Sequence, residues 1–360
     1  MSRNLFRISL VLCFAFAAIR SHAQQTPGPS VSLPVLGFVL DPAGALRPLV
    51  GVTGSASIGA PVNLGFGIAQ AVTPPNRDYV LAMTADANWP LLLQTSGNTI
   101  TAVRTDSLFG PEAQTADCYQ PALVDDGPRA RCRRGSSGTN GRSHIDAIAL
   151  SPTGSSAGFY SASTGRIYAV GNLPQSPALS GTFDVASFGT ISAFGISDDA
   201  QTMVFGVSSG DTGSLFLIAS GQPPRLIGPI HHASAIQFLR NSNGAVIADD
   251  LDNTIYTLSG GQIYAIAGPG DGISTPVGIA VSNDNQKVFV GNSGSASVTT
   301  IGLNGTGTQS VSCDCTLTGL RPTNADSVFQ LTDFSGGPIL LFDGNSTTPR
   351  TIFVPVRAQF

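Results

Sequence analysis

The feature that most constrains this chain is a recurring pattern of short apolar runs separated by turn residues, which is clearest in Pro276–Leu303. Three apolar runs, Gly278–Val281, Val288–Val290 and Val298–Leu303, alternate there with two breaks rich in Asn, Asp, Gly and Ser. β-Branched and aromatic runs bounded by such residues are typical of strands joined by turns. The segment is therefore predicted to form three consecutive strands.

The same pattern recurs along the chain. Ala147–Val170 aligns without a gap on Ala235–Leu258 and also on Val80–Val103. The predicted first strands end 43, 67, 46, 42, 43 and 41 residues apart, at Leu40, Met83, Leu150, Ile196, Phe238, Val281 and Pro322. A period in the low forties with three or four strands per unit indicates a β-propeller, because neighbouring sheets must bury each other's apolar faces.

Seven such positions predict an all-β protein, a β-propeller with seven blades of four-stranded antiparallel sheets. The alternatives are a ring of six or eight blades, or a β-sandwich, whose strands have no reason to align without gaps over 24 residues. The spacing of 67 exceeds the others by about 24, which predicts an insertion at about residues 105–143. The ring is expected to close where Leu33–Gly51 meets Thr316–Val356.

Composition supports strands rather than helices. Only 11% of the residues are charged, 42 are Gly, and the chain has one Glu, Glu112, and one Lys, Lys287. Good helix formers are therefore scarce on the surface, while Gly, Ser, Thr, Val and Ile are plentiful.

The N-terminus has the organisation of a secretory signal peptide. A basic start, Met1–Arg7, precedes an apolar run of 12 residues, Ile8–Ile19, and small residues precede a cleavage site after Ala23. The run is shorter than the roughly 20 residues that a membrane span needs. We expect a signal peptide at 1–23, a tether at 24–32 and a single propeller domain at 33–360. The protein is then secreted, periplasmic or at the cell surface.

The net negative charge of the chain limits the kinds of partner that it can bind. Without the N-terminal segment the chain has 15 basic and 22 acidic residues, so it is a poor general binder of nucleic acid. No later segment is apolar and long enough to span a membrane, and we expect a monomer.

The segment from Gly278 to Val298 resembles the YVTN-type β-propeller repeat. Phe289-Val290-Gly291-Asn292 stands for Tyr-Val-x-Asn, and the preceding Ser282-Asn283-Asp284-Asn285 stands for a Ser-x-Asp-Gly turn. An earlier repeat keeps the glycine, as Gly154. The resemblance implies a secreted bacterial propeller. It implies no reaction, because relatives range from binding proteins to lactonase-like enzymes, and it transfers no catalytic residue.

The cysteines suggest disulfides. Cys118 and Cys132 bracket part of the insertion, and in an exported protein such a pair most simply forms a disulfide. Cys313 and Cys315 could form a strained local disulfide, bind a soft metal or remain free thiols, and a second disulfide is the leading interpretation. The insertion also holds Arg129–Arg134, a basic cluster that fits a solvated face better than recognition of an acidic partner.

Three histidines, His144, His231 and His232, lie just before predicted first strands. His231 and His232 precede one repeat. A later turn of that same repeat contains Asp249 and Asp250, followed by Asp252. By analogy with propellers, both positions lie near the rim of the central channel, which makes these histidines and aspartates candidate ligand-binding residues. We assign no catalytic residue, no metal site and no cofactor from the sequence.

The sequence favours a binding or scaffold module at the cell surface for a protein or glycan partner over an enzyme. The alternative is a lactonase-like or lyase-like propeller enzyme with its site in the axial channel. An enzyme should bring several Asp, His, Asn or Arg side chains together at one channel mouth with shifted pKa values. A binding module should have a bland channel and a broad exposed patch elsewhere.

Overall fold

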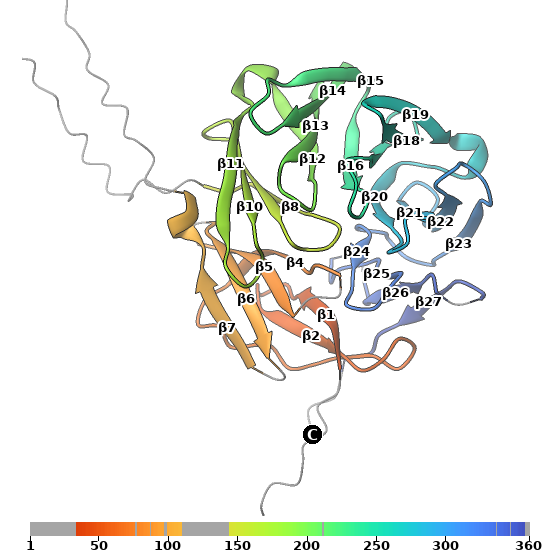
Figure 1. Cartoon of the computed structure of the whole chain (residues 1–360). Coiled ribbons are helices and arrows are strands. Elements are labelled where there is room, and N and C mark those ends of the chain that lie inside the picture. The colour runs from red at the N-terminus through yellow and green to blue at the C-terminus, as the bar shows by residue number, and fades with distance from the viewer. Residues whose placement is uncertain are drawn as a thin grey trace, which may run out of the picture. The chain divides into compact units, whose positions relative to one another are not determined.

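The structure is a computed structural model that describes residues 34–75, 78–86, 88–96, 99–109, 144–210, 212–335, 337–345 and 347–356. The regular structure of its described part is almost entirely strand, and the strands form seven sheets arranged in a ring (Figure 1). This confirms the predicted seven-bladed β-propeller. No helix in the described part of the chain is long and apolar enough to cross a membrane.

The strands follow one another in chain order within each sheet, and all pair antiparallel. Blade 1 contains β1 (Val35–Leu40), β2 (Leu46–Val50) and β3 (Ser57–Ile58). Blade 2 contains β4 (Ile68–Val72), β5 (Tyr79–Thr84), β6 (Pro90–Ser96) and β7 (Thr99–Arg104). Blade 3 contains β8 (Ala147–Leu150), β9 (Ala157–Ser161), β10 (Arg166–Gly171) and β11 (Ala178–Asp184). Blades 4 and 5 contain β12 (Thr190–Ile196), β13 (Thr202–Ser209), β14 (Thr212–Ala219) and β15 (Arg225–Ile230); and β16 (Ala233–Phe238), β17 (Ala245–Asp249), β18 (Thr254–Ser259) and β19 (Gln262–Ala267).

Blades 6 and 7 complete the ring. They contain β20 (Pro276–Val281), β21 (Lys287–Asn292), β22 (Ser297–Gly302) and β23 (Gln309–Ser312); and β24 (Arg321–Pro322), β25 (Val328–Gln330), β26 (Leu340–Asp343) and β27 (Arg350–Phe353). Three short 3₁₀ helices occur in the described connections: η1 (Asp106–Phe109), η2 (Ala186–Phe188) and η3 (Pro269–Asp271).

The ring closes through the C-terminal residues. Blade 1 has three strands, and Val356 forms a parallel bridge with Ile58 at the place of a fourth strand. On the inner side, the backbone N–H of Asn324 donates to the carbonyl of Leu36, which links blade 7 to blade 1. Both ends of the described propeller are thereby joined, which leaves no open sheet face between the first and last blades.

The first strand of each blade is the innermost one (Figure 1). As predicted, Leu40, Leu150, Ile196 and Val281 each end such a strand. The prediction for blade 2 was wrong, because Met83 lies in the second strand, β5, and the inner strand is β4. All six residues of β5 are buried, so its sequence has the apolar run expected of an inner strand, while β4 is short and more exposed.

The core lies between adjacent blades. Between blades 6 and 7, the ring of Phe289 packs 4.9 Å from that of Phe329 and 6.1 Å from that of Phe342, measured between centroids. Phe289 and Phe342 are fully buried. Burying a side chain of this size contributes about 1.5–3 kcal/mol, so the contacts between neighbouring sheets hold the ring together.

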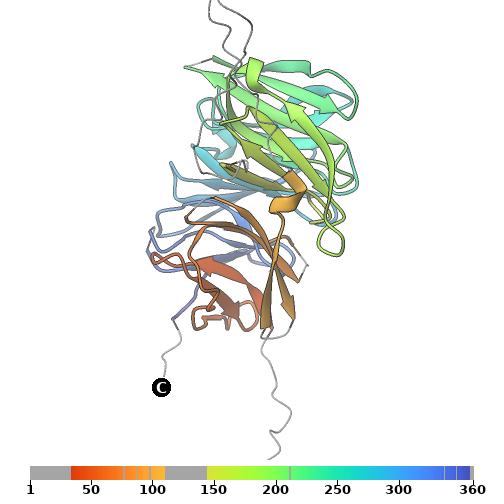
Figure 2. The ribbon, with the colours of Figure 1, turned by 90° about the vertical axis from the view of Figure 1, so that its left-hand side faces the viewer.

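The predicted insertion begins with η1, between blades 2 and 3 (Figure 2). Phe109 packs 5.2 Å from Phe159 and 5.3 Å from Tyr168 of blade 3, between ring centroids. Residues 110–143, which include Cys118, Cys132 and the arginines 129–134, lie outside the described residues. After β23, a disulfide joins Cys313 to Cys315.

Candidate functional site

The antiparallel register sorts the loops onto two sides of the ring. The connection into an inner strand lies beside the turn that follows the second strand, as the pairing of Ala233 with Asp249 shows. We call this side the entry face. The turns between first and second strands, such as Ser197–Gln201 and Ser282–Gln286, lie on the opposite side, which we call the turn face.

Asp249 fixes the local structure of the entry face of blade 5. It is the last residue of β17, and it is fully buried. Its carboxylate accepts hydrogen bonds from the backbone N–H groups of His231 (2.8 Å), His232 (3.3 Å), Leu251 (3.0 Å) and Asp252 (3.0 Å). One carboxylate therefore ties the connection before β16 to the turn after β17.

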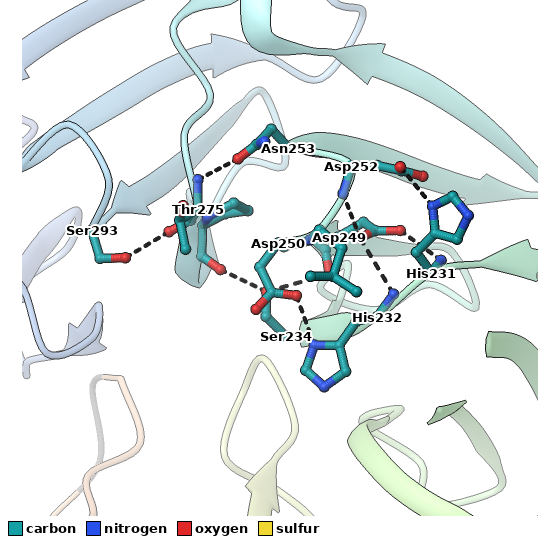
Figure 3. Close-up of polar contacts among 12 residues, drawn as sticks. His231, His232, Ser234, Asp249, Asp250, Asp252, Asn253, Thr275 and Ser293 are labelled. Atoms are coloured by element: carbon teal, nitrogen blue, oxygen red, sulfur yellow. Dashed lines mark hydrogen bonds and ion pairs between the residues drawn. The ribbon is translucent and has the colours of Figure 1, made fainter. Parts of the chain in front are cut away.

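Two histidine–aspartate pairs are held by this arrangement. Nδ1 of His231 lies 2.6 Å from Oδ1 of Asp252, and Nδ1 of His232 lies 2.6 Å from Oδ1 of Asp250. Figure 3 shows the two pairs on different sides of the buried Asp249. The side chain of His231 is 52% exposed and that of His232 is 35% exposed. We call this group the His–Asp cluster; its five members are His231, His232, Asp249, Asp250 and Asp252.

Four of the five candidates named from the sequence thus come together, along with Asp252. The fifth, His144, lies elsewhere, in the connection into blade 3. Its Nδ1 is 3.2 Å from Oδ1 of Asp146, and its Nε2 is 2.9 Å from the side-chain amide of Asn88. His144 therefore forms a separate polar contact between blades 2 and 3.

A cavity of about 590 Å³ lies among the inner strands, and we call it the axial cavity. Its walls come mainly from β1, β4 and β24, and it extends from Asp41, at the turn face, to Arg321 and Phe334, at the entry face. Gln70 and Gln237 also line it. None of the candidates named from the sequence lines this cavity.

The charged groups of the axial cavity are paired. Nη2 of Arg321 lies 3.4 Å from Oδ2 of Asp333, and Nε of Arg47 lies 2.8 Å from Oδ2 of Asp41. Burial alone raises the pKa of Asp41, but hydrogen bonds from Ala45 N–H, Arg47 and Ala43 N–H, with the charge of Arg47, lower it below its ordinary value. Asp41 is therefore held as an anion in a turn, with its carboxylate already satisfied.

Arg240 spans several blades at the turn face. Its Nη2 donates to the carbonyl of Pro152 in blade 3, at 3.3 Å, and to Oδ1 of Asn283 in blade 6. Its backbone N–H and carbonyl both bond to the side chain of Asn285, each at 3.0 Å. The guanidinium of Arg240 therefore lies across part of the inner ring at this face.

No family model and no curated protein matches the chain. Among solved structures, it is similar to a functionally unknown protein from Desulfotomaculum acetoxidans, at 14% identity and a TM-score of 0.55, over 90% of this chain and 100% of that one. It is also similar to a catalytically inactive variant of virginiamycin B lyase from Staphylococcus aureus with quinupristin, at 14% identity and a TM-score of 0.52, over 83% and 87%. A nidogen/laminin complex matches at 11% identity and a TM-score of 0.46, over 78% and 93%. The first two likenesses show the propeller fold alone.

Proposed function

We propose that the chain is an exported binding module that holds part of a protein or glycan partner in its axial cavity. The observation that carries the proposal is the cavity itself, which places the partner in the channel and not on a broad exposed patch elsewhere, where a binding module was expected to hold it. Its volume of about 590 Å³ lies within the roughly 300–1,000 Å³ of typical ligand pockets. Its walls are inner strands whose backbones are fixed by pairing on one side and by blade packing on the other, so the site is formed before any ligand arrives.

The lining suits uncharged polar groups next to apolar ones. Among the described residues, the carboxamide of Gln70 has no hydrogen-bond partner. In the same set of residues, the carboxamide of Gln237 makes only one contact, of 3.5 Å, with the carbonyl of Phe238. A carboxamide both donates and accepts, which matches sugar hydroxyls and peptide groups. Phe38 and Phe334 are among the apolar residues that line the same cavity, and both also pack against cores between blades.

The state of the charged groups favours binding over catalysis. Asp41 and Asp333 each lie in an ion pair with an arginine. Because its pKa is lowered, Asp41 stays ionised and is a poor general acid. Export itself, by the signal peptide expected at 1–23, remains a prediction from the sequence.

The test is a binding screen of the mature chain against a glycan array and a peptide display library. Ala69 is exposed and lines the cavity, so Ala69→Trp is expected to occupy part of it and to weaken binding of the ligands found at least tenfold. Leu226→Trp, on the outer strand β15 where the residue is 59% exposed, is the matched control. Unchanged binding by Ala69→Trp, or no ligand in either screen, would contradict the proposal.

A second candidate function, a propeller enzyme of the lactonase or lyase class, is favoured by the His232–Asp250 pair. The Nδ1 contact at 2.6 Å orients the ring, and Nε2 has no partner among the described residues. A histidine oriented through Nδ1 by a carboxylate is a common general base. A panel of lactones and esters tests this: activity that His232→Gln abolishes and His144→Gln leaves intact would support the enzyme, and a panel without turnover would exclude it.

A further inference from the structure

The entry face of blade 5 holds a second feature, separate from the axial cavity. One donor atom each from His231, Asp249 and Asp252 lies within 4.8 Å of the other two. A first-row metal ion with bonds of about 2.0–2.2 Å can span such a set after small side-chain rotations. The three residues come from two segments, the connection before β16 and the turn after β17, so the cluster forms only in the folded chain.

The donors are held in place without an ion. The four backbone N–H groups that bond to Asp249 fix both segments, and within the described part of the chain its Oδ2 atom accepts only the bond from His231 N–H, at 2.8 Å. A carboxylate oxygen has about two lone-pair sites, so Oδ2 keeps one for a metal. Nδ1 of His231 and Oδ1 of Asp252 already point toward each other at 2.6 Å. An ion bound by both atoms would replace this direct contact between His231 and Asp252.

The charge of the cluster favours a cation. Three carboxylates, of Asp249, Asp250 and Asp252, occur within four consecutive positions. Among the described residues, Asp252 pairs with His231 and Asp250 pairs with His232. No arginine or lysine of the described residues forms an ion pair with any of the three carboxylates. With neutral imidazoles the cluster carries three negative charges, whose mutual repulsion a bound divalent ion would relieve.

We propose that His231, Asp249 and Asp252 bind one divalent transition-metal ion, of which Zn²⁺ is the best match. One imidazole nitrogen and two carboxylate oxygens are ligands that Zn²⁺ accepts readily, whereas Ca²⁺ and Mg²⁺ prefer sites made of oxygen. The ion requires the Nδ1 lone pair, so His231 carries its proton on Nε2 when the metal is bound. His232 and Asp250 stay paired beside the site. Three protein ligands leave a coordination position open to water or to a donor atom of a partner.

The experiment uses the tag-free mature chain, treated with a chelator and titrated with ZnCl₂ and, separately, with CaCl₂ by calorimetry. Zn²⁺ is expected to bind with a stoichiometry of one and Ca²⁺ at least tenfold more weakly. Asp252→Asn and His231→Gln are each expected to weaken Zn²⁺ binding at least tenfold, while His144→Gln, which changes the other exposed His–Asp contact, leaves it unchanged. No stoichiometric Zn²⁺ binding, or equal affinity in all variants, would overturn the proposal.

A measurement on the unchanged protein removes dependence on how the variants fold. In ¹H–¹⁵N spectra of the histidine rings, Zn²⁺ is expected to shift the Nδ1 signal of His231 strongly and to leave both nitrogens of His144 in place. Shifts at His144 equal to those at His231 would show nonspecific binding and would also overturn the proposal. Because neither readout involves the axial cavity, failure here leaves the proposed binding function standing.

Discussion

The carboxylate of Asp198 ties three blades together at the turn face. Its Oδ1 accepts hydrogen bonds from the backbone N–H of Thr153, at 2.8 Å, and from the Thr153 hydroxyl, at 2.6 Å. Its Oδ2 accepts the backbone N–H of Asn241, at 2.8 Å. Blade 4 is thereby linked to blade 3 on one side and to blade 5 on the other.

The change Asp198→Ala removes all three bonds. Hydrogen bonds to a charged group contribute about 1.5–3 kcal/mol each, and here water can replace part of that because the Asn241 N–H is exposed and the Thr153 groups are partly buried. We expect the free energy of unfolding to fall by about 2–4 kcal/mol, which is a large part of the roughly 5–15 kcal/mol that stabilises a typical protein.

The assay is urea unfolding at pH 7, followed by circular dichroism, with the neighbouring Asp199→Ala as the matched control. Among the described residues, Oδ1 of Asp199 accepts bonds only from Ser197 and Gln201, within its own turn. Asp198→Ala should therefore lose more stability than Asp199→Ala, by about 1–2 kcal/mol, and should couple to Thr153→Val in a double-mutant cycle. Equal losses in the two alanine variants, or no coupling to Thr153, would refute the claim that Asp198 joins blades.

Two further predictions concern the core and the turns. Phe289→Ala should lower the free energy of unfolding by about 3–5 kcal/mol in the same urea assay, because this ring fills the space between blades 6 and 7; a loss below about 1 kcal/mol would show that the blades do not pack there. The hydrogen bond from the Ser282 hydroxyl, with that from Gln286 N–H and the charge of Lys287, lowers the pKa of Asp284. The folded state then binds this proton less readily than the unfolded state, so the stabilisation is present above about pH 4 and is lost as the pH falls through the folded-state pKa. Asp284→Asn should flatten the stability curve in that acidic window, and parallel curves for the two proteins would contradict the assignment.

Much of the fold could be predicted because several turns between first and second strands are specified locally. The Ser282 hydroxyl donates to Asp284 and accepts the backbone N–H of Lys287, and Ser197 makes the same bonds within its own turn. The fourth turn position needs a positive φ, which is +66° at Gly154 and +57° at Asn285. Glycine and asparagine tolerate this conformation. The sequence between β4 and β5 of blade 2 lacks this serine-led pattern, and the inner strand of that blade was therefore missed.

The candidate site could be predicted only in part. His231, His232, Asp249 and Asp250 come together because antiparallel pairing of β16 with β17 places the start of one strand beside the end of the other. A propeller implies a central channel, but the residues that line the axial cavity gave no signal in the sequence, because they come from blades far apart in the chain. Whether an inner-strand side chain faces a neighbouring blade or the cavity depends on how the strands are placed around the ring, which no local pattern specifies.

The central claim is that a partner is held among the inner strands. Hydrogen–deuterium exchange of the mature chain, with and without a ligand from the glycan or peptide screen, tests it most directly. We predict slower exchange in peptides covering residues 35–42, 68–73 and 320–335, which contain most of the residues that line the axial cavity, and unchanged exchange in the outer strands β15 and β19. Protection confined to the outer strands, with the inner strands unaffected, would contradict the account.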